Sequence, residues 1–578
     1  MVKIVKSNNK IVKSNNKNND FISATKIKNY LLKDPLIDWL SYYKIYDINN
    51  KPNKNRKNQE TTDNFLEYIF NEGKNYEKYI MDNLKSQYEI KTVCKNDEFY
   101  GIDKFEETKQ LMNIGTNIIY QGMLYNYKNK TFGIPDLLIR SDFINKMFEN
   151  TIPIEEELVN NKFYYIVVDI KSSTIQLDCK GHHILNSNNL IIYKGQLLIY
   201  TLALSEIFNF KINKAFILGK RFSWISNNIK YVENNPFKKL GLIDYKNIDF
   251  HYYELIDNAL LWINNVKTFG KNWKVLPKPS KKELYPNMKN SKDNGYRKVK
   301  TQIANELSEL TSLWYVSVKN RENAHNNNIF SWKDKRCSSQ ILEIKNKRGE
   351  ILDKIMEINR SDTDIIYPPK INYDINNWKV IEENTLEFYI DYETNCTDYT
   401  NYIFMIGVGF YNAKWEFKNF TMVQLNEECQ EDIFKEFWDY INNILLKYNK
   451  TTSRFIHWTK AEPISYNKSI DKFKLPTKNF IDLYDVFINE PIVIKGALNF
   501  SLKEIAKACY NLGLIESIWP KNTLCSNGSD ALLYSIQLYK SGRKIRKTNK
   551  ILCDIINYNE IDCKVLFEII TYLRNNNI

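Results

Sequence analysis

The sequence predicts an α/β protein with two sheet-containing domains joined by a helical connector. Strand-like runs and a helix alternate in residues 117–222, and a second set of strand-like runs begins at residue 385. The stretch between these regions is rich in Lys, Asn and Glu and has a helical pattern. Strands that meet helices in this order indicate mixed sheets covered by helices.

The composition allows several packed domains and favours a polyanionic partner. At 578 residues the chain is long enough for about two to four domains of ordinary size. Hydrophobic residues make up 43% of the chain, which is sufficient for packed cores. The 82 Lys and Arg residues exceed the 68 Asp and Glu residues, and cationic side chains that neutralise phosphates release counterions. Because Lys is abundant throughout, charge alone does not identify nucleic acid as the partner.

Several classes of protein are disfavoured by motifs that the sequence lacks. The nine cysteines include no C-x-x-C pair, which argues against a zinc ribbon, an iron–sulfur cluster or a disulfide framework. We find no run of about 18 apolar residues and no apolar leader, and therefore expect no membrane partner. We expect an intracellular, soluble protein of the cytoplasm or the nucleus, and a virus-associated protein also fits these features. The missing G-x-x-x-x-G-K-[ST] loop argues against a built-in ATPase motor.

The first part of the chain is predicted to hold a tail and several helices. Residues 1–20 contain a tandem KIVKSNN repeat and are typical of a low-complexity tail. The first domain is predicted over residues 21–285. It begins with a helix that Ser23 can cap, and Pro35 marks the break before a second helix. A longer amphipathic helix is expected from residue 64 to about residue 88.

Strand-like segments then follow, with one helix among them. The expected order is three strands, a helix and a further strand, over residues 117–126, 132–140, 163–173, 190–208 and 214–222. Residues 286–384 are predicted to form a helical, basic connector. Residues 385–578 are predicted to form the second α/β domain, which starts with three hairpin-compatible strands.

One constellation of charged residues lies on the predicted strands of the first domain. Side chains two residues apart on a strand lie on the same face, so Asp169 and Lys171 of VVDIKSS project together. The segment GIPD can bring the carboxylate of Asp136 beside that of Asp169. Two converging carboxylates bind a hard Mg²⁺ or Mn²⁺ ion, and a neighbouring lysine can orient or deprotonate an attacking water. A lone D-x-K tripeptide is more often a surface ion pair, but the buried neighbours and the upstream G-x-P-D favour catalysis.

Two predicted helices carry further candidate residues. Glu77 of GKNYEKYI is an additional potential metal ligand, although such a residue by itself is usually a solvated glutamate. Gln196 and Tyr200 lie four residues apart, on one helical face. Their amide and phenol groups can donate hydrogen bonds to a phosphate or a base. Considered alone, a tyrosine at the edge of the core is the more common interpretation.

The ordered set G-x-x-x-E on a helix, IIYQGML, GIPDLLIR, VVDIKSS and GQLLIY resembles the RecB-like branch of the PD-(D/E)XK nucleases. That branch includes lambda-exonuclease-type and CRISPR-associated exonucleases. The resemblance covers roughly residues 21–285 and implies a restriction-endonuclease-like fold. It also implies metal ligation by Glu77, Asp136 and Asp169, assistance to the water by Lys171, and DNA contacts by Gln196 and Tyr200. Many relatives hold an iron–sulfur cluster whose first cysteine lies near the start of the domain; here LLKDPLIDWL has Asp34, so we expect no cluster.

The second domain carries its own set of acidic residues. Asp391 and Glu393 of FYIDYET face one way on a predicted strand, and Tyr558 and Asp562 lie one helical turn apart. This pattern resembles the DEDD exonucleases of the RNase H-like fold, over about residues 385–578. The resemblance implies that the three carboxylates hold two metal ions and that Tyr558 orients the attacking water.

One position departs from the DEDD pattern. The usual middle aspartate is not obvious, and Glu462 of IHWTKAE is the best substitute, with Asp482 as the alternative. Glutamate can bind Mg²⁺, but its extra methylene changes the reach of the ligand. The alternative interpretation is an inactive RNase H-like domain that binds nucleic acid or braces the nuclease.

The sequence therefore predicts a Mg²⁺- or Mn²⁺-dependent nuclease with two modules. The preference for DNA and for ends, and hence an exonuclease of repair, recombination or defence, is implied by the resemblance alone. Two alternatives stay open. One is an RNA-processing nuclease in which the C-terminal site dominates, and the other is a catalytically weak, nucleic-acid-binding scaffold that works with a separate helicase.

Overall fold

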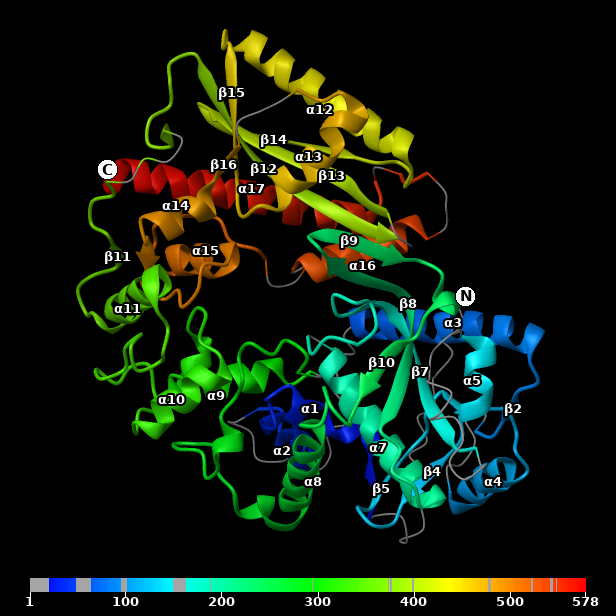
Figure 1. Cartoon of the computed structure of the whole chain (residues 1–578). Helices are drawn as coiled ribbons and strands as arrows, with labels where there is room; N and C mark the ends of the chain where they lie inside the picture. Colours follow the sequence, from blue (N-terminus) through cyan, green and yellow to red (C-terminus); the bar gives the residue numbers. More distant parts are fainter. Residues whose placement is uncertain are drawn as a thin grey trace, which may run out of the picture. The chain divides into compact units, whose positions relative to one another are not determined.

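A computed structural model gives the fold of most of the chain (Figure 1). The residues that it describes are 20–47, 64–94, 101–148, 163–187, 189–293, 295–372, 374, 377–397, 400–476, 480–520, 523–525, 527–540, 544–546 and 548–578. The tail predicted at residues 1–20 lies outside these ranges, apart from its last residue.

The chain folds into two compact units. The first comprises Met1–Thr61, Glu67–Pro286 and Asn290–Ile303, and the second comprises Thr62–Leu66, Asn287–Lys289 and Ala304–Ile578. The segment at 286–384 that we predicted as a connector is thus divided between the two units, with its larger part in the second.

Helices begin the first unit, largely where the sequence predicts them. They are η1 (Ala24–Ile27), α1 (Lys28–Leu31), α2 (Leu36–Tyr43) and α3 (Asn64–Gln87), which belongs to this unit from Glu67 onward. The predicted cap at Ser23 is wrong in its detail. Ser23 precedes η1, but its side chain makes no capping hydrogen bond and instead lies 3.1 Å from the Thr25 hydroxyl. Pro35 does mark the break, because it directly precedes α2.

A seven-stranded sheet forms the centre of the first unit, in the order β10-β8-β7-β6-β3-β2, with β9 paired to β8. The strands are β2 (Lys91–Thr92), β3 (Ile118–Tyr120), β6 (Leu137–Arg140), β7 (Tyr165–Gln176), β8 (Lys214–Ser226), β9 (Ile229–Glu233) and β10 (Gly241–Asp244). Strand β7 is central, antiparallel to β6 and parallel to β8. The connection from β7 to β8 contains helix α7 (Leu190–Phe208), which agrees with its predicted bounds.

Two of the predicted strands are each split in the structure. Residues 117–126 form β3 and β4 (Leu124–Asn126), and residues 132–140 form β5 (Thr131–Gly133) and β6. Strands β4 and β5 belong to a separate three-stranded sheet with β1 (Ile22–Ser23). The breaks have a backbone cause: Gln121 adopts a left-handed φ of 51°, and Pro135 has no N–H to donate to a ladder.

Among the described residues, α7 is the one helix with the length and apolar composition of a membrane span. Its most apolar window is 56% buried inside the unit, where α7 packs against β7, β4 and α8 (Tyr252–Phe269). Gly195 permits close packing of α7 on α1, because a Cβ there would lie 2.4 Å from a methyl carbon of Leu31. The apolar character of α7 is therefore explained by its place in the core.

A buried ion-pair cluster holds residues 290–303 in the first unit. Lys300, on α9 (Arg297–Leu307), is fully buried and places its Nζ 2.9 Å from Asp34 Oδ2 and 3.0 Å from Asp293 Oδ2. Asn290 donates a further hydrogen bond to Asp34 Oδ2 over 2.9 Å. Asp34 thus pairs with a lysine that follows it by 266 residues in the sequence.

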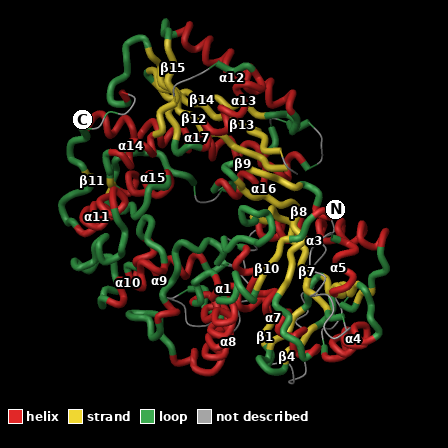
Figure 2. Tube along the Cα trace, viewed as in Figure 1, coloured by secondary structure: helices red, strands yellow, loops and turns green. Residues whose placement is uncertain are grey.

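The second unit contains a five-stranded sheet in the order β14-β13-β12-β15-β16 (Figure 2). Its strands are β12 (Thr385–Thr397), β13 (Thr400–Asn412), β14 (Lys414–Thr421), β15 (Thr452–His457) and β16 (Phe480–Asp482). The first three are antiparallel, as predicted, whereas β15 and β16 run parallel to β12. The mixed α/β architecture expected from the sequence is confirmed.

Helices cover both faces of this sheet. Those that pack on its strands are α12 (Glu427–Lys447), α13 (Ala461–Phe473), α14 (Leu483–Asn489), α16 (Gly528–Tyr539) and α17 (Lys550–Asn576). The unit also contains α10 (Val318–Asn326), α11 (Asn346–Arg360) and α15 (Leu502–Asn511). Phe388 and Ile390 of β12 join a core with α12, whereas Tyr389 joins a core with α11, α15 and α17. Figure 1 shows α12 and α17 on opposite sides of the strands. Asp391 follows Ile390 and therefore faces α17.

Candidate metal centres

The first centre is built on the central strand of the N-terminal sheet. Asp169 and Lys171 lie two residues apart on β7 and form an ion pair, with Asp169 only 2% exposed. Asp136 directly precedes β6, the neighbouring strand, and its Oδ2 accepts a hydrogen bond from the Ile170 N–H over 2.7 Å. The structure thus brings these three predicted residues together at one point of the sheet.

The charges of these three side chains are strongly coupled. Burial raises the pKa of Asp136 well above its usual range, and the neighbouring carboxylate of Asp169 raises it further. Burial acts to lower the pKa of Lys171, but the carboxylates of Asp169 and Asp136 outweigh burial and raise it. Two buried carboxylates beside a single ammonium leave an excess of negative charge that a bound cation would offset.

Glu77 approaches the centre from α3 and is held by two residues that we did not predict. The Tyr120 hydroxyl donates to Glu77 Oε1 over 2.7 Å, and Gln121 Nε2 donates to the same oxygen over 3.1 Å. The backbone N–H of Gln121 donates to the Asp136 carbonyl over 2.8 Å. Gln121 therefore connects two candidate ligands, one through its side chain and the other through its backbone. Its sequence signal is its place in IIYQGML, one of the segments that carry the resemblance.

Gln196 and Tyr200, the residues expected to contact DNA, lie on α7. Gln196 Nε2 donates to the Tyr200 hydroxyl over 2.7 Å, and Tyr200 is only 2% exposed. The Tyr200 ring lies against Gly133, where a Cβ would be 2.4 Å from the ring. Burial raises the pKa of Tyr200, and the charge of Asp169 adds to this effect, so the phenol is near the carboxylates. Gln196 is half-buried and is the more accessible of the two.

The second centre is an acidic triad in the C-terminal unit. Carboxylate oxygens of Asp391 and Glu393 on β12 and of Asp562 on α17 lie within 4.8 Å of one another. This is the one group of three or more potential ligands with such spacing in the described part of the chain. The carboxylates of the first centre are therefore less closely gathered.

An asparagine in the helix and a glycine in the sheet support the triad. Asn559 is fully buried and donates to Asp391 Oδ2 over 2.7 Å. Asp391 is paired in register with Gly407 of β13, where a Cβ would lie 1.6 Å from Asn559 Oδ1. The hydrogen bond to Asp391 thus requires a residue without a side chain at 407. Neither residue was predicted, because the sequence does not reveal that β13 and α17 meet here.

Burial and mutual repulsion disfavour ionisation of the triad. Burial raises the pKa of all three carboxyl groups well above their usual range. The largest carboxylate contributions come from Asp562 for Asp391, from Asp391 for Glu393, and from Glu393 for Asp562. Lys503, on α15, opposes these shifts and lies with its Nζ 4.6 Å from the Tyr558 ring centroid. The triad is thus a buried acidic site with one nearby cation.

The structure separates the two candidates for the middle acidic position. Glu462 lies in the first turn of α13, is 5% exposed, and raises the pKa of both Asp391 and Glu393. Asp482 instead caps α14, because its Oδ1 accepts hydrogen bonds from the Tyr484 N–H over 3.0 Å and the Thr459 N–H over 2.8 Å. Glu462 is therefore the candidate whose charge acts on the triad, although it lies outside the triad itself.

Tyr558 takes the position expected from the Y-x-x-x-D spacing. It lies one turn before Asp562 on α17, is 8% exposed, and lowers the pKa of Asp562 as a hydrogen-bonding partner. Burial raises the pKa of the Tyr558 phenol, and the charges of Asp562 and Asp391 raise it further. The phenol is thus a neutral donor at the edge of the triad.

Comparison of the chain with protein-family models gives no match, and comparison with curated proteins gives none either. The functional argument therefore depends on the residues of the two centres and on their geometry.

Proposed function

We propose that this chain is a metal-dependent nuclease that hydrolyses DNA phosphodiester bonds, with a RecB-like PD-(D/E)XK domain followed by an RNase H-like, DEDD-type domain. The observation that supports it best is the meeting of Asp136, Asp169 and Lys171 on adjacent strands. In the described residues Lys171 pairs directly with Asp169 only, so the neighbouring Asp136 carboxylate has no ammonium of its own, unlike the two carboxylates that share Lys300. A second buried carboxylate is costly without a cation, but it is useful in a metal site.

The residues of the first centre fit a hard divalent cation. Asp136 and Asp169, with Glu77 as a third candidate, offer only oxygen ligands, which Mg²⁺ and Mn²⁺ prefer. Such an ion, when bound, would stabilise negative charge on the phosphate and lower the pKa of a water molecule. In this proposal the two aspartates hold the ion, and Tyr120 and Gln121 fix the orientation of the Glu77 carboxylate.

In this proposal the other residues of the first centre act on the attacking water and contact the nucleic acid. The Lys171 ammonium, which is oriented by Asp169, donates to the attacking water or to a phosphate oxygen. Gln196 has an amide that is half-exposed, and it contacts the DNA, while Tyr200 holds that amide in place. The net charge of +14 favours binding of the polyanion.

For the C-terminal unit we propose a second site of the DEDD type. Its sheet order and the parallel placement of β15 and β16 beside β12 support an RNase H-like fold. Asp391, Glu393 and Asp562 would hold divalent ions with help from Glu462, and Tyr558 would orient the attacking water. An RNA-processing nuclease that uses this site is the second candidate function, because the triad is the tighter cluster of carboxylates.

Cleavage of end-labelled linear DNA, single- and double-stranded, tests the proposal with Mg²⁺, Mn²⁺ or EDTA. A matched RNA strand is included, and wild type is compared with Lys171→Ala and Asp391→Ala. We expect metal-dependent DNA cleavage that Lys171→Ala abolishes and Asp391→Ala leaves measurable.

The other results separate the alternatives. Cleavage that survives Lys171→Ala but falls in Asp391→Ala assigns the chemistry to the C-terminal site, and a preference for RNA would support the second candidate. Binding of nucleic acid without metal-dependent turnover by wild type would contradict both enzymes and favour the scaffold that works with a helicase.

A further inference from the structure

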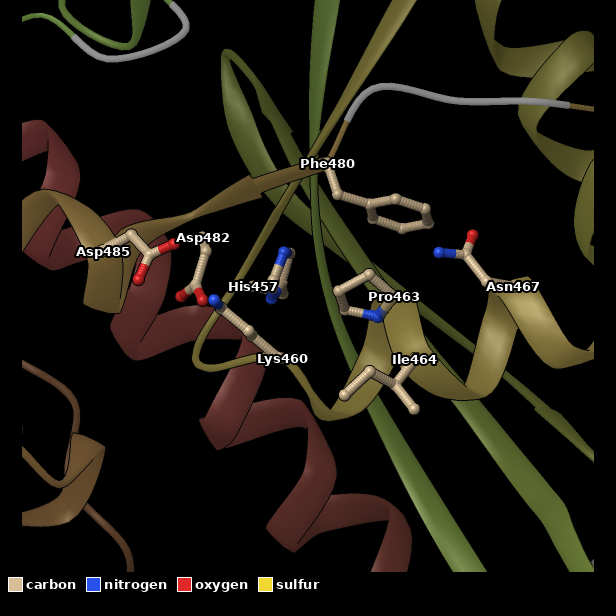
Figure 3. A pocket seen from close by; sticks show the side chains of 8 residues that line it. All are labelled: His457, Lys460, Pro463, Ile464, Asn467, Phe480, Asp482 and Asp485. Carbon is tan, nitrogen blue, oxygen red and sulfur yellow. The ribbon is translucent and has the colours of Figure 1, made fainter. Parts of the chain in front are cut away.

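A pocket of about 310 Å³ lies at the carboxyl ends of β15 and β16 (Figure 3). Its walls include His457 at the end of β15, Phe480 and Asp482 of β16, and Pro463 and Asn467 of α13. Figure 3 shows the His457 imidazole between Asp482 on one side and Pro463 on the other, with the Phe480 ring above. The carboxyl edge of parallel strands is the usual place for ligands in such sheets.

Three buried polar atoms around this pocket have no hydrogen-bond partner: His457 Nδ1, Glu462 Oε2 and Asp482 Oδ2. His457 is only 1% exposed, and it is paired in register with Asp482. Its Nδ1 lies 3.5 Å from Glu462 Oε2, which is too long for a well-formed hydrogen bond. His457 and Asp482 line the pocket and Glu462 lies beside it, and because each unpaired buried polar atom is costly, the unpaired atoms of the two lining residues indicate a site that a ligand completes.

The chemistry of the pocket restricts the class of ligand. Carboxylate oxygens only accept hydrogen bonds, so the ligand must bring donors. A phosphate is disfavoured, because Asp482 and Asp485 line the pocket against the single ammonium of Lys460. The Phe480 ring and Pro463 offer apolar surface to a flat group, and Asn467 offers both a donor and an acceptor. The pocket volume of 310 Å³ suits a small ligand.

We propose that this pocket binds an amino-bearing nucleobase, that of cytosine, guanine or adenine, from a nucleotide beside the C-terminal centre. Asp482 accepts from the exocyclic amino group, and Phe480 contacts the face of the base. Glu462, a candidate ligand of the C-terminal centre, lies beside the pocket, because its Oε2 is 3.5 Å from His457 Nδ1. This inference rests on the proposed function, because it assigns a base preference to that site.

Binding of mononucleotides to the full-length protein in EDTA tests the inference, with calorimetry as the readout. Wild type is titrated with dCMP, dGMP, dAMP and dTMP. We expect the amino-bearing nucleotides to bind at least about 5-fold more tightly than dTMP, the lower end of the discrimination from one paired hydrogen-bonding contact. This comparison needs no variant and is independent of folding defects.

Two substitutions sharpen the test. Asp482→Asn preserves the cap of α14, because asparagine is an equally good N-cap, but it places a donor amide where Oδ2 accepts. We expect this variant to lose the preference for amino-bearing bases. Phe480→Leu should weaken the binding of all four nucleotides to a similar extent, because the ring contacts the face of any base. Asp439→Asn, at an exposed position of α12 outside the pocket, is the matched control and should behave as wild type.

Equal affinity of wild type for the four nucleotides, or an unchanged preference in Asp482→Asn, would overturn the inference. So would a complete lack of binding by wild type. None of these results bears on metal-dependent DNA cleavage at Lys171, so failure of the base pocket is distinguishable from failure of the proposed nuclease.

Discussion

Gln121 shows how a single residue can serve a site in two ways. Its side-chain amide donates to Glu77, and its backbone N–H donates to the carbonyl of Asp136. Gln121 itself has a left-handed φ, which non-glycine residues rarely adopt. Strain of this kind costs on the order of 1–3 kcal/mol and persists where the surroundings require it. The two contributions can be separated by substitution.

We predict that Gln121→Gly weakens Mn²⁺ binding at the first centre without loss of stability. Glycine relieves the strain and keeps the N–H, but it removes the link to Glu77. Loss of a residue that orients a ligand lowers metal affinity about 10- to 100-fold. Titration of Mn²⁺ by electron paramagnetic resonance measures the affinity, in an Asp391→Ala background that removes the second centre.

Gln121→Ala is the matched control for this prediction. It loses the same amide but retains the strain of the left-handed backbone. It should therefore bind Mn²⁺ as weakly as Gln121→Gly and have a lower melting temperature than that variant. If both variants bind Mn²⁺ like the parent, Gln121 does not orient Glu77.

We predict that Gly407→Ala damages the second centre. A Cβ at this position would overlap Asn559 Oδ1, so Asn559 must move away from Asp391. Overpacking of this kind lowers the free energy of unfolding by roughly 1–3 kcal/mol. Chemical denaturation measures this loss. The double variant Gly407→Ala/Asn559→Ala should recover part of the stability, and a single variant as stable as wild type would contradict the packing argument.

Spacing alone predicts the pairs of site residues that are local in the sequence, whereas Glu77 was joined to Asp169 through the resemblance. Asp169 and Lys171 share a face of one strand, and Tyr558 and Asp562 share a face of one helix. Gln121 and Asn559 were missed for a physical reason, because each acts on a partner that is distant in the sequence and is reached only through tertiary pairing.

At the scale of elements, long and strongly periodic segments are predicted well and irregular ones are not. Helix α7 has its predicted bounds, and the three strands from β12 to β14 form the expected antiparallel set. The split of residues 117–126 into β3 and β4 was missed, because apolar alternation continues through Gln121 although the backbone turns there. Helices α13 and α14 were also missed, since α13 contains Pro463 and many polar residues and α14 is only 7 residues long.

The docking of α2 is predicted to depend on pH. Burial raises the pKa of Asp38 to about 7, although Asn29 and Trp262 both donate hydrogen bonds to its carboxylate. Since the folded state favours the protonated carboxyl, the stability from this group is fully present below about pH 4. It is then lost as the pH rises toward 7, by on the order of 2–4 kcal/mol.

Thermal unfolding at pH values from 4 to 8 tests this expectation. The decrease in melting temperature with rising pH that is attributed to Asp38 should be absent in Asp38→Asn, because the asparagine side chain does not ionise. A decrease of the same size in the variant and in wild type would assign the pH dependence to other groups.

At the scale of the whole molecule, the coarse architecture was predictable and the division of the chain between the units was not. Two sheet-containing units follow from the two sets of strands. The membership of residues 290–303 in the first unit depends on Lys300, which is fully buried. A lysine in the sequence RKVKTQ is normally expected in solvent, so no local signal reveals its partner.

We predict that Lys300→Met strongly destabilises the first unit. Removal of one partner from a buried ion pair leaves Asp34 with an uncompensated charge, which costs about 3–5 kcal/mol. Lys298→Met, two residues away and exposed, removes the same charge from the chain and should cost little. Calorimetry of the two variants makes the comparison, and similar melting curves would show that the buried pair is unimportant.

The same ion pair has a consequence for synthesis of the protein on the ribosome. Asp34 and Lys300 are separated by 266 residues, so the first helices cannot complete their packing until α9 has emerged. At about 5–20 residues per second this interval lasts roughly 13–53 s. During that time the nascent chain carries Asp34 without its lysine, and the first unit closes only as translation of the second begins.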